Sequence, residues 1–271
     1  MKLALNGATT MKANLETDLR AAQLAGFDFV EIWAAKLRDF LLTRSTSDLR
    51  NLFVYYGLKP LSINSIEHIT FRTPAAYERI KTECENLSLL AAQVECPYVV
   101  VVPGKLPGGS ATREQIIEES VRVLRELAMI SGRHGVALAF EFLGQRDCSV
   151  QTLELANDIV KEVARDNVGL VIDSFHFYAG GSTLEMISHV DAGRLFIFHI
   201  NDAEDLPREQ LEDRHRLLPG TGILPLKQML TAFRNIGYDG AASVEIFRPE
   251  YWEREPIEFA QQCKSAVQGL L

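Results

Sequence analysis

The sequence lacks the features that mark membrane, secreted and thiolate-metal proteins. No apolar run approaches the roughly eighteen residues that a membrane-spanning helix needs. The first residues, MKLALNGATT, contain neither the long apolar core nor the cleavage site of a signal peptide. The four cysteines form no CxxC pair and lie too far apart for a local metal motif, which is typical of reduced thiols. These absences predict a cytoplasmic protein without a membrane partner.

Positive charge is also scarce. The chain has 28 lysine and arginine residues against 36 aspartate and glutamate residues, which gives a net charge of −8. Proteins that bind nucleic acids broadly need a basic surface to contact phosphates. The composition therefore predicts no nucleic-acid partner and favours a small-molecule substrate.

Strand-like and helix-like segments alternate along all 271 residues without a linker or a break in composition. The expected strands are 2–6, 27–33, 59–65, 98–102 and four later runs, which contain Glu141, Asp173, His199 and Glu245. The expected helices are 14–25, 47–56 with Ser47 as N-cap, 74–94, 112–134, 152–163, 184–189, 226–236 and a last one from Pro256. Eight strand–helix units predict one domain over residues 1–271, an α/β fold of the (β/α)8 TIM-barrel type. A doubly wound open sheet is the alternative, but no glycine-rich phosphate loop follows the first strand.

Each of the last four runs carries one potential metal ligand near its end. The runs are ALAFEFLG, VGLVIDSF, LFIFHIND and AASVEIF, and the ligands are Glu141, Asp173, His199 and Glu245. Side chains two residues apart share a face of a strand, so each ligand shares a face with the small or apolar residues before it. A carboxylate buried alone in such a run costs several kcal/mol unless it is paired or binds a metal.

In a barrel these four strand ends meet at one mouth, where catalytic groups gather. Taken singly, each residue could be a capped strand end or a partner in an ion pair, but four in register favour one divalent metal ion. Three carboxylates and one imidazole suit Mn²⁺, Zn²⁺, Mg²⁺ or Co²⁺, and they do not choose among these ions.

Several segments carry a family resemblance. They are RDNVGLVIDSFHFYAGGS at 165–182, HINDAEDLP from His199, LPGTG at 218–222, SVEIFRPEYW from Ser243, the early NGATT and the FEFLG around Glu141. Together they resemble the sugar isomerase/epimerase barrels related to xylose isomerase, and within that superfamily the inosose (2-keto-myo-inositol) isomerases of inositol breakdown. The resemblance runs over nearly the whole chain and is densest from about residue 137 to 252.

The resemblance implies that Glu141, Asp173, His199 and Glu245 hold one divalent metal. It also implies that His176 and Arg216 contact substrate oxygens, although without it His176 would be read as an exposed loop residue and Arg216 as a solvated one. The implied activity moves the ketone of inosose to the neighbouring carbon by proton transfer through a metal-bound enediolate. Glu141 and Glu245 are the candidate acid/base pair, with their order of action open. A homodimer is compatible with such a barrel.

Other side chains at the expected mouth have two interpretations each. Glu31 and Glu67 end strand-like runs and are candidates for hydrogen bonds to substrate hydroxyls or for ion pairs at the barrel rim. Asn6 is a candidate substrate contact or a turn residue. Trp33, Tyr251 and Trp252 are candidates for an aromatic wall or for ordinary packing.

Three other functions use the same kind of barrel. A ketose 3-epimerase or a hydroxypyruvate isomerase would use the same metal ligands, so the ligands do not separate them from an inosose isomerase. An endonuclease IV-type repair enzyme has a D-x-H ligand pair, which Asp213-Arg214-His215 resembles, and His68 lies near the end of the third expected strand. However, the fourth strand ends in VVVVPG, where that family has a histidine. A barrel that binds without catalysis is the third alternative.

Overall fold

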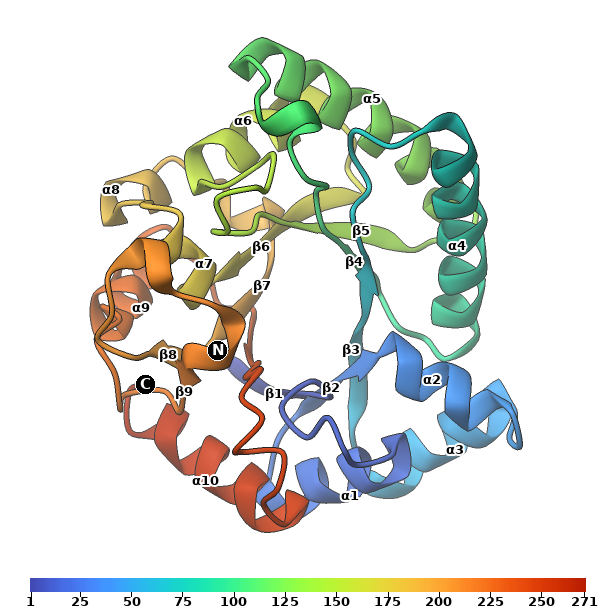
Figure 1. Ribbon diagram of the computed structural model, residues 1–271. Coiled ribbons are helices and arrows are strands. Elements are labelled where there is room, and N and C mark those ends of the chain that lie inside the picture. The colour runs from blue at the N-terminus through green and yellow to red at the C-terminus, as the bar shows by residue number, and fades with distance from the viewer.

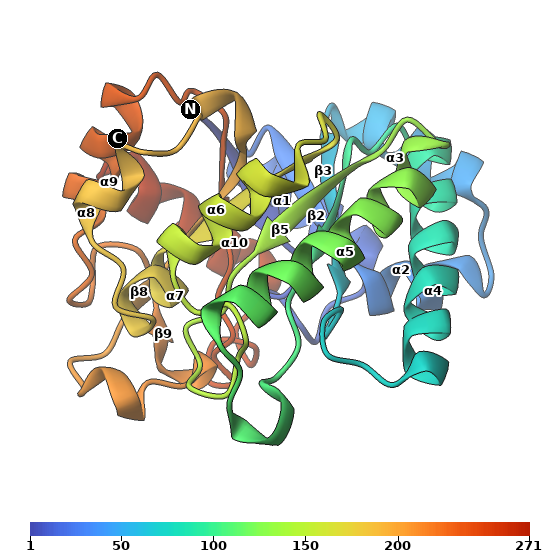
Figure 2. The same cartoon turned by 90° about the horizontal axis from the view of Figure 1, so that it is seen from above.

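Eight parallel strands close into a barrel, and helices surround it (Figure 1). The computed structural model describes residues 1–108 and 110–271. Around the barrel the strands follow the order β1-β10-β7-β6-β5-β4-β3-β2. Figure 2 shows helices α5 and α6 running along the outside of β5, as the helices of such a barrel must. The predicted TIM barrel is confirmed. No helix in the described part of the chain is long and apolar enough to cross a membrane.

The strands and helices have the following bounds. The barrel strands are β1 (Lys2–Asn6), β2 (Phe29–Trp33), β3 (Lys59–Ile66), β4 (Tyr98–Val101), β5 (Ala137–Glu141), β6 (Val168–Asp173), β7 (Leu195–Ile200) and β10 (Ala241–Val244), and the short β8 (Asp202–Ala203) and β9 (Arg216–Leu217) pair antiparallel outside it. The helices are α1 (Leu15–Ala25), α2 (Ala34–Leu41), α3 (Thr46–Tyr56), α4 (Pro74–Gln93), α5 (Arg113–Gly132), α6 (Leu153–Val163), α7 (Ser174–Ala179), α8 (Leu184–Ile187), α9 (Leu226–Asn235) and α10 (Pro256–Gln268).

One expected helix start was wrong. The N-cap of α3 is Ser45, not Ser47. The Ser45 hydroxyl accepts a hydrogen bond from the backbone N–H of Asp48, and the Asp48 carboxylate accepts one from the Ser45 N–H. This reciprocal pair is a capping box, and it satisfies N–H groups at the start of the helix that would otherwise lack partners.

Two helices, α2 and α7, do not follow from the sequence pattern. The six residues of α7 directly follow β6 and are mostly aromatic, so they show no helical period. Asp173 caps this helix by accepting a hydrogen bond from the His176 N–H at 2.8 Å. His176 therefore lies on a buried helix and not in an exposed loop.

The side chains inside the barrel form their own small core. It contains Ala4, Leu61, Val100, Val102, Ala139, Val171, Ile197 and Ala241. Ala139, Val171 and Ile197 each stand two residues before one of the predicted ligands. The residues between them, such as Phe140 and Ile172, pack outward in the larger core under the helices. The predicted alternation is therefore confirmed, and it points the ligands into the barrel mouth.

Candidate metal centre and active site

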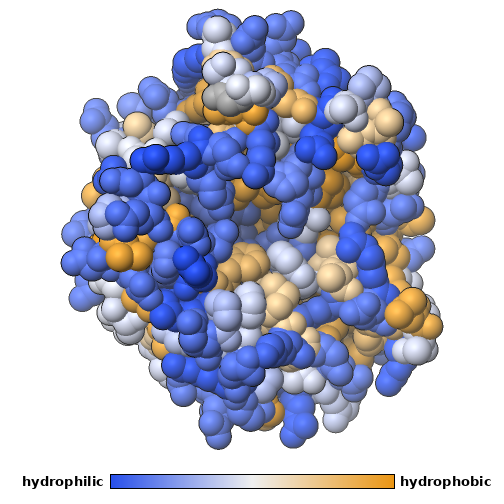
Figure 3. All heavy atoms as spheres, viewed as in Figure 1, coloured by the Kyte–Doolittle hydropathy of each residue, from blue (hydrophilic) through white to orange (hydrophobic). Residues whose placement is uncertain are grey.

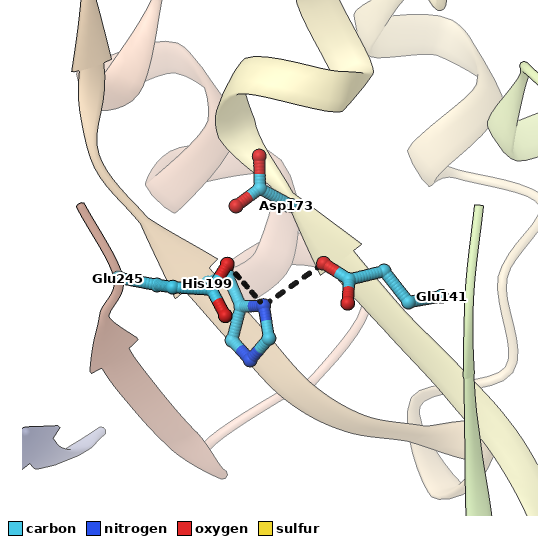
Figure 4. A group of neighbouring side chains, drawn as sticks. All are labelled: Glu141, Asp173, His199 and Glu245. Carbon is cyan, nitrogen blue, oxygen red and sulfur yellow. Dashed lines mark hydrogen bonds and ion pairs between the residues drawn. The ribbon is translucent and has the colours of Figure 1, made fainter. Parts of the chain in front are cut away.

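The four predicted ligands converge at the C-terminal ends of β5, β6, β7 and β10 (Figure 4). All are buried, and one ligand atom from each lies within 4.8 Å of the others. The nitrogen Nδ1 of His199 lies 2.9 Å from Oε1 of Glu141 and 3.3 Å from Oε2 of Glu245. Asp173 pairs with His199 in the β6–β7 register, so neighbouring strands supply the set.

Asp173 is held by three donors from different elements. Its Oδ1 caps α7, and its Oδ2 accepts hydrogen bonds from Nδ2 of Asn201 and Nη1 of Arg216, both at 2.8 Å. Asn201 also donates to the backbone carbonyl of Glu245 at 3.1 Å. These bonds fix the position of the Asp173 carboxylate before any ligand binds.

The two glutamates differ in how firmly they are held. Oε1 of Glu245 accepts hydrogen bonds from the side-chain amides of Asn6 at 3.0 Å and Asn64 at 2.9 Å. Oε1 of Glu141 lies 2.9 Å from Nδ1 of His199, and its Oε2 has no hydrogen-bond partner among the described residues. Burial raises the pKa of Glu141 to about 7, although the nearby His199 imidazole acts in the opposite direction. Burial opposes ionisation of Glu245 too, but His199 and Arg216 outweigh it and lower its pKa.

This donor set fits a divalent metal ion. Three buried carboxylates so close together repel one another strongly unless a cation lies among them. Their oxygens and the Nδ1 of His199 face a common centre, which gives an oxygen-rich site with one nitrogen. Such a set suits hard or borderline divalent cations.

The two predicted substrate residues lie beside this centre. Arg216 is 1% exposed, and its guanidinium lies 5.0 Å from the ring centre of Phe175 and 5.1 Å from that of Phe247. Its Nη1 donates to Oε2 of Glu245 at 3.1 Å as well as to Asp173, and its Nη2 lies 3.0 Å from Nε2 of His176. The solvated position that its charged segment suggests is therefore wrong.

Arg216 reaches the site from a long loop that Asp202 fastens to the barrel. Asp202 is the buried first residue of β8, and its Oδ1 accepts hydrogen bonds from the N–H groups of Ala203 and Leu224. Its Oδ2 accepts a third from the N–H of Gly220 at 2.9 Å. Gly222 lies so close to this carboxylate that a Cβ there would stand 2.6 Å from Oδ1. The short β8–β9 ladder then carries the chain back to Arg216.

We expect Asp202→Asn to destabilise the protein by about 1–3 kcal/mol, because its amide NH2 would face backbone N–H donors that lose their acceptor. The loop would also be held less firmly, so Arg216 should contact the substrate less well and KM should rise. Urea unfolding and steady-state kinetics would measure both effects. Asp205→Asn changes an exposed carboxylate in the same loop, so it is the matched control. Equal behaviour of the two variants would contradict the fastening role of Asp202.

A cavity of about 500 Å³ opens above the four ligands. Its lining includes Glu141, Glu245, His176 and Arg216, with Trp33 and Phe247 among its apolar residues and the side chains of Glu67, His68, Lys105, Gln145, Asp147 and Asp213 among its polar ones. Figure 3 shows this face of the molecule hollowed over the barrel, with hydrophilic residues around the hollow. Its volume suits a small polar molecule.

Several of the secondary candidates lie elsewhere. Trp33 lines the cavity, but Tyr251 and Trp252 do not. Glu67 lines the cavity as an exposed residue, whereas Glu31 is fully buried and does not line it. Asn6 is also buried, and it donates to Glu31 and Glu245. The interpretation of Glu31 and Asn6 as substrate contacts is therefore wrong.

Two asparagines at the site, Asn64 and Asn201, were not among the candidates, and Asp213 was considered only as part of a nuclease-type ligand pair. Asn64 and Asn201 hold the ligand carboxylates, and Asp213 accepts hydrogen bonds from Arg216 at 3.0 and 3.2 Å. Asn201 stands two residues after His199, so the strand alternation itself could have pointed to it. His215 does not join Asp213 at the site, since its Nδ1 accepts a hydrogen bond from the N–H of Glu212.

Comparison with known proteins identifies the family of this chain. A family model described as xylose isomerase-like TIM barrel matches residues 19–263, and the chain belongs to that family. The chain is similar to the inosose isomerase of Bacillus velezensis, with 39% identity over 98% of this chain and 97% of the relative. It is 40% identical to the inosose isomerase of Bacillus subtilis, over 98% of this chain and 96% of the relative. The crystal structure of the IolI protein with a binding zinc atom matches 100% of this chain and 98% of its own with a TM-score of 0.96 and 39% identity. The family resemblance found in the sequence is therefore confirmed.

Proposed function

We propose that the protein is an inosose isomerase, which moves the ketone of 2-keto-myo-inositol to the neighbouring ring carbon. The observation that carries this proposal is the cluster of Glu141, Asp173, His199 and Glu245, of which the two glutamates line a cavity of about 500 Å³. The inosose isomerases that resemble the chain over almost its full length support the choice of substrate.

The four-residue cluster would hold one divalent metal ion, of which Mn²⁺, Zn²⁺, Mg²⁺ and Co²⁺ are the candidates. When bound, such an ion polarises the ketone and the neighbouring hydroxyl and so acidifies the C–H of the hydroxyl-bearing carbon. The similar IolI protein has a crystal structure with a binding zinc atom, which supports a divalent metal ion in this protein too.

Glu141 and Glu245 are the proposed acid/base pair. One carboxylate takes the proton from the hydroxyl-bearing carbon, which leaves an enediolate, and a proton is returned to the former carbonyl carbon. The hydroxyl proton passes to the oxygen of the former ketone, so the ketone moves by one position. Oε2 of Glu141 is the freer acceptor because no described residue donates to it, whereas Glu245 is held by two amides and a guanidinium.

Arg216 and His176 are the proposed contacts to the substrate oxygens. The guanidinium of Arg216 stays charged and would stabilise negative charge on the enediolate. Burial above all, and then the charge of Arg216, lower the pKa of His176, although Asp173 acts against them. A neutral imidazole offers the substrate oxygens one N–H donor and one acceptor nitrogen. We further propose that residues 1–271 form one domain and that the protein is cytoplasmic. We also propose that it forms a homodimer and has no nucleic-acid partner.

The test is a proton NMR time course in D2O with 2-keto-myo-inositol, the purified protein, and either one of the four metal ions or EDTA. The expected result is metal-dependent appearance of the shifted inosose with deuterium at the new C–H. Turnover of an open-chain ketohexose without turnover of the inosose would replace the proposal by a ketose 3-epimerase. No turnover of either compound by the metal-loaded protein would overturn the proposed activity.

A further inference from the structure

Glu31 is a buried carboxylate close to the metal centre that is neither one of the four ligands nor a wall of the cavity. It lies on β2, across the barrel mouth from β5 and β6, and is 0% exposed. Its Oε2 lies 2.9 Å from Nε2 of His199. That nitrogen is on the other side of the imidazole ring from Nδ1, which faces Glu141 and Glu245.

Both neighbouring strands hold Glu31 in this place. Asn6 on β1 donates its side-chain amide to Oε2 at 2.9 Å, and the hydroxyl of Ser62 on β3 donates to Oε1. The same Asn6 amide also donates to Oε1 of Glu245 at 3.0 Å. Glu31 therefore has a fixed position relative to the metal ligands, on elements that are not themselves the source of any ligand.

The contact bears on which nitrogen of His199 carries a proton when an ion is bound. Carboxylates face both ring nitrogens, Glu141 and Glu245 at Nδ1 and Glu31 at Nε2, and Nε2 makes no hydrogen bond of its own in this structure. Once an ion takes the lone pair of Nδ1, the hydrogen of a neutral ring must be on Nε2, where Glu31 is the acceptor within reach. In a neutral imidazole the other nitrogen then has a free lone pair. Here that nitrogen is Nδ1, which points at the common centre of the cluster.

We infer that Glu31 is a positioning residue for the metal centre: it fixes the orientation and tautomer of His199 so that Nδ1 binds the ion. Carboxylates behind a ligand histidine also make its free nitrogen more basic, and their loss typically weakens metal affinity about 10–100-fold. This inference rests on the metal site of the proposed function and is independent of the substrate.

The first test needs no variant. Protein labelled with ¹⁵N in histidine and loaded with Zn²⁺ should show His199 protonated on Nε2 and free of hydrogen on Nδ1. Binding of Zn²⁺ through Nε2 would overturn the inference. If the parent protein bound no metal ion at all, the metal site of the proposed function would be wrong. Binding of Zn²⁺ through the other nitrogen would contradict only the role of Glu31, so the two outcomes are distinct.

The second test measures Zn²⁺ affinity by competition with a chelating dye. Glu31→Gln keeps the shape and one acceptor, so we expect about a tenfold weaker affinity, and Glu31→Ala should approach a hundredfold. Glu67→Gln removes a carboxylate charge at an exposed position of the cavity wall and should leave the affinity unchanged. Affinity within twofold of the parent in the folded Glu31→Ala variant would overturn the inference. Circular dichroism in EDTA checks that each variant is folded.

Discussion

Glu141→Gln should lower the turnover of 2-keto-myo-inositol by about a thousandfold while the protein stays folded. Removal of a general acid or base typically costs about 10²–10⁴ in rate, and Glu141 also supplies an oxygen to the proposed metal site. Glutamine has nearly the same shape, so the cavity is preserved, but its amide cannot take a proton from the substrate carbon. The rate is measured by NMR with the metal ion in excess over its dissociation constant in the variant.

The control for this variant is Glu118→Gln, which makes the same chemical change at an exposed position of α5, outside the cavity. Its turnover should stay within a few fold of the parent. If Glu141→Gln kept its metal ion and its rate remained within tenfold of the parent, Glu141 would not be one of the acid/base pair, and the role would pass to Glu245 together with another group.

Arg216→Met should destabilise the metal-free protein by about 3–5 kcal/mol, because breaking a buried ion pair leaves its partner charge uncompensated. Here Asp173, Glu245 and Asp213 all lose their hydrogen bonds to the guanidinium. A bound divalent ion restores positive charge among the first two, so the loss should be smaller with Zn²⁺ in excess than in EDTA. Urea unfolding in the two conditions measures the difference.

Arg214→Met is the matched control, since Arg214 is exposed, lies in the same loop and pairs with Glu212 at the surface. Such a surface pair contributes little to stability, so this variant should unfold like the parent in both conditions. A loss for Arg216→Met that is the same with and without Zn²⁺ would mean that the guanidinium and the ion do not neutralise the same carboxylates.

The strand alternation was enough to predict where the four ligands point. Burial decides which face of a strand is apolar, and Ala139, Val171 and Ile197 mark that face two residues before Glu141, Asp173 and His199. The closed barrel then follows from eight strand–helix units, and it brings the four strand ends together without further information.

The supporting residues could not be predicted in the same way, because their roles depend on contacts across the barrel. Nothing near Glu31 in the sequence shows that it lies 2.9 Å from His199, which is 168 residues later. Arg216 stands in a charged segment and is buried only because Asp202 and the β8–β9 ladder fold the loop inward. The short helix α7 forms because Asp173 caps it, so its aromatic sequence alone gave no sign of it.

The four metal-type ligands all lie between residues 141 and 245, and β1 to β4 contribute none. The end of β2 and the segments that follow β3 and β4 instead supply parts of the cavity wall, such as Trp33, Glu67 and Lys105. Mutations in those walls can therefore accumulate while the reactive centre stays intact. A lineage built on this barrel can try new substrates by changing such wall residues and keep one proton-transfer chemistry at the ends of β5, β6, β7 and β10.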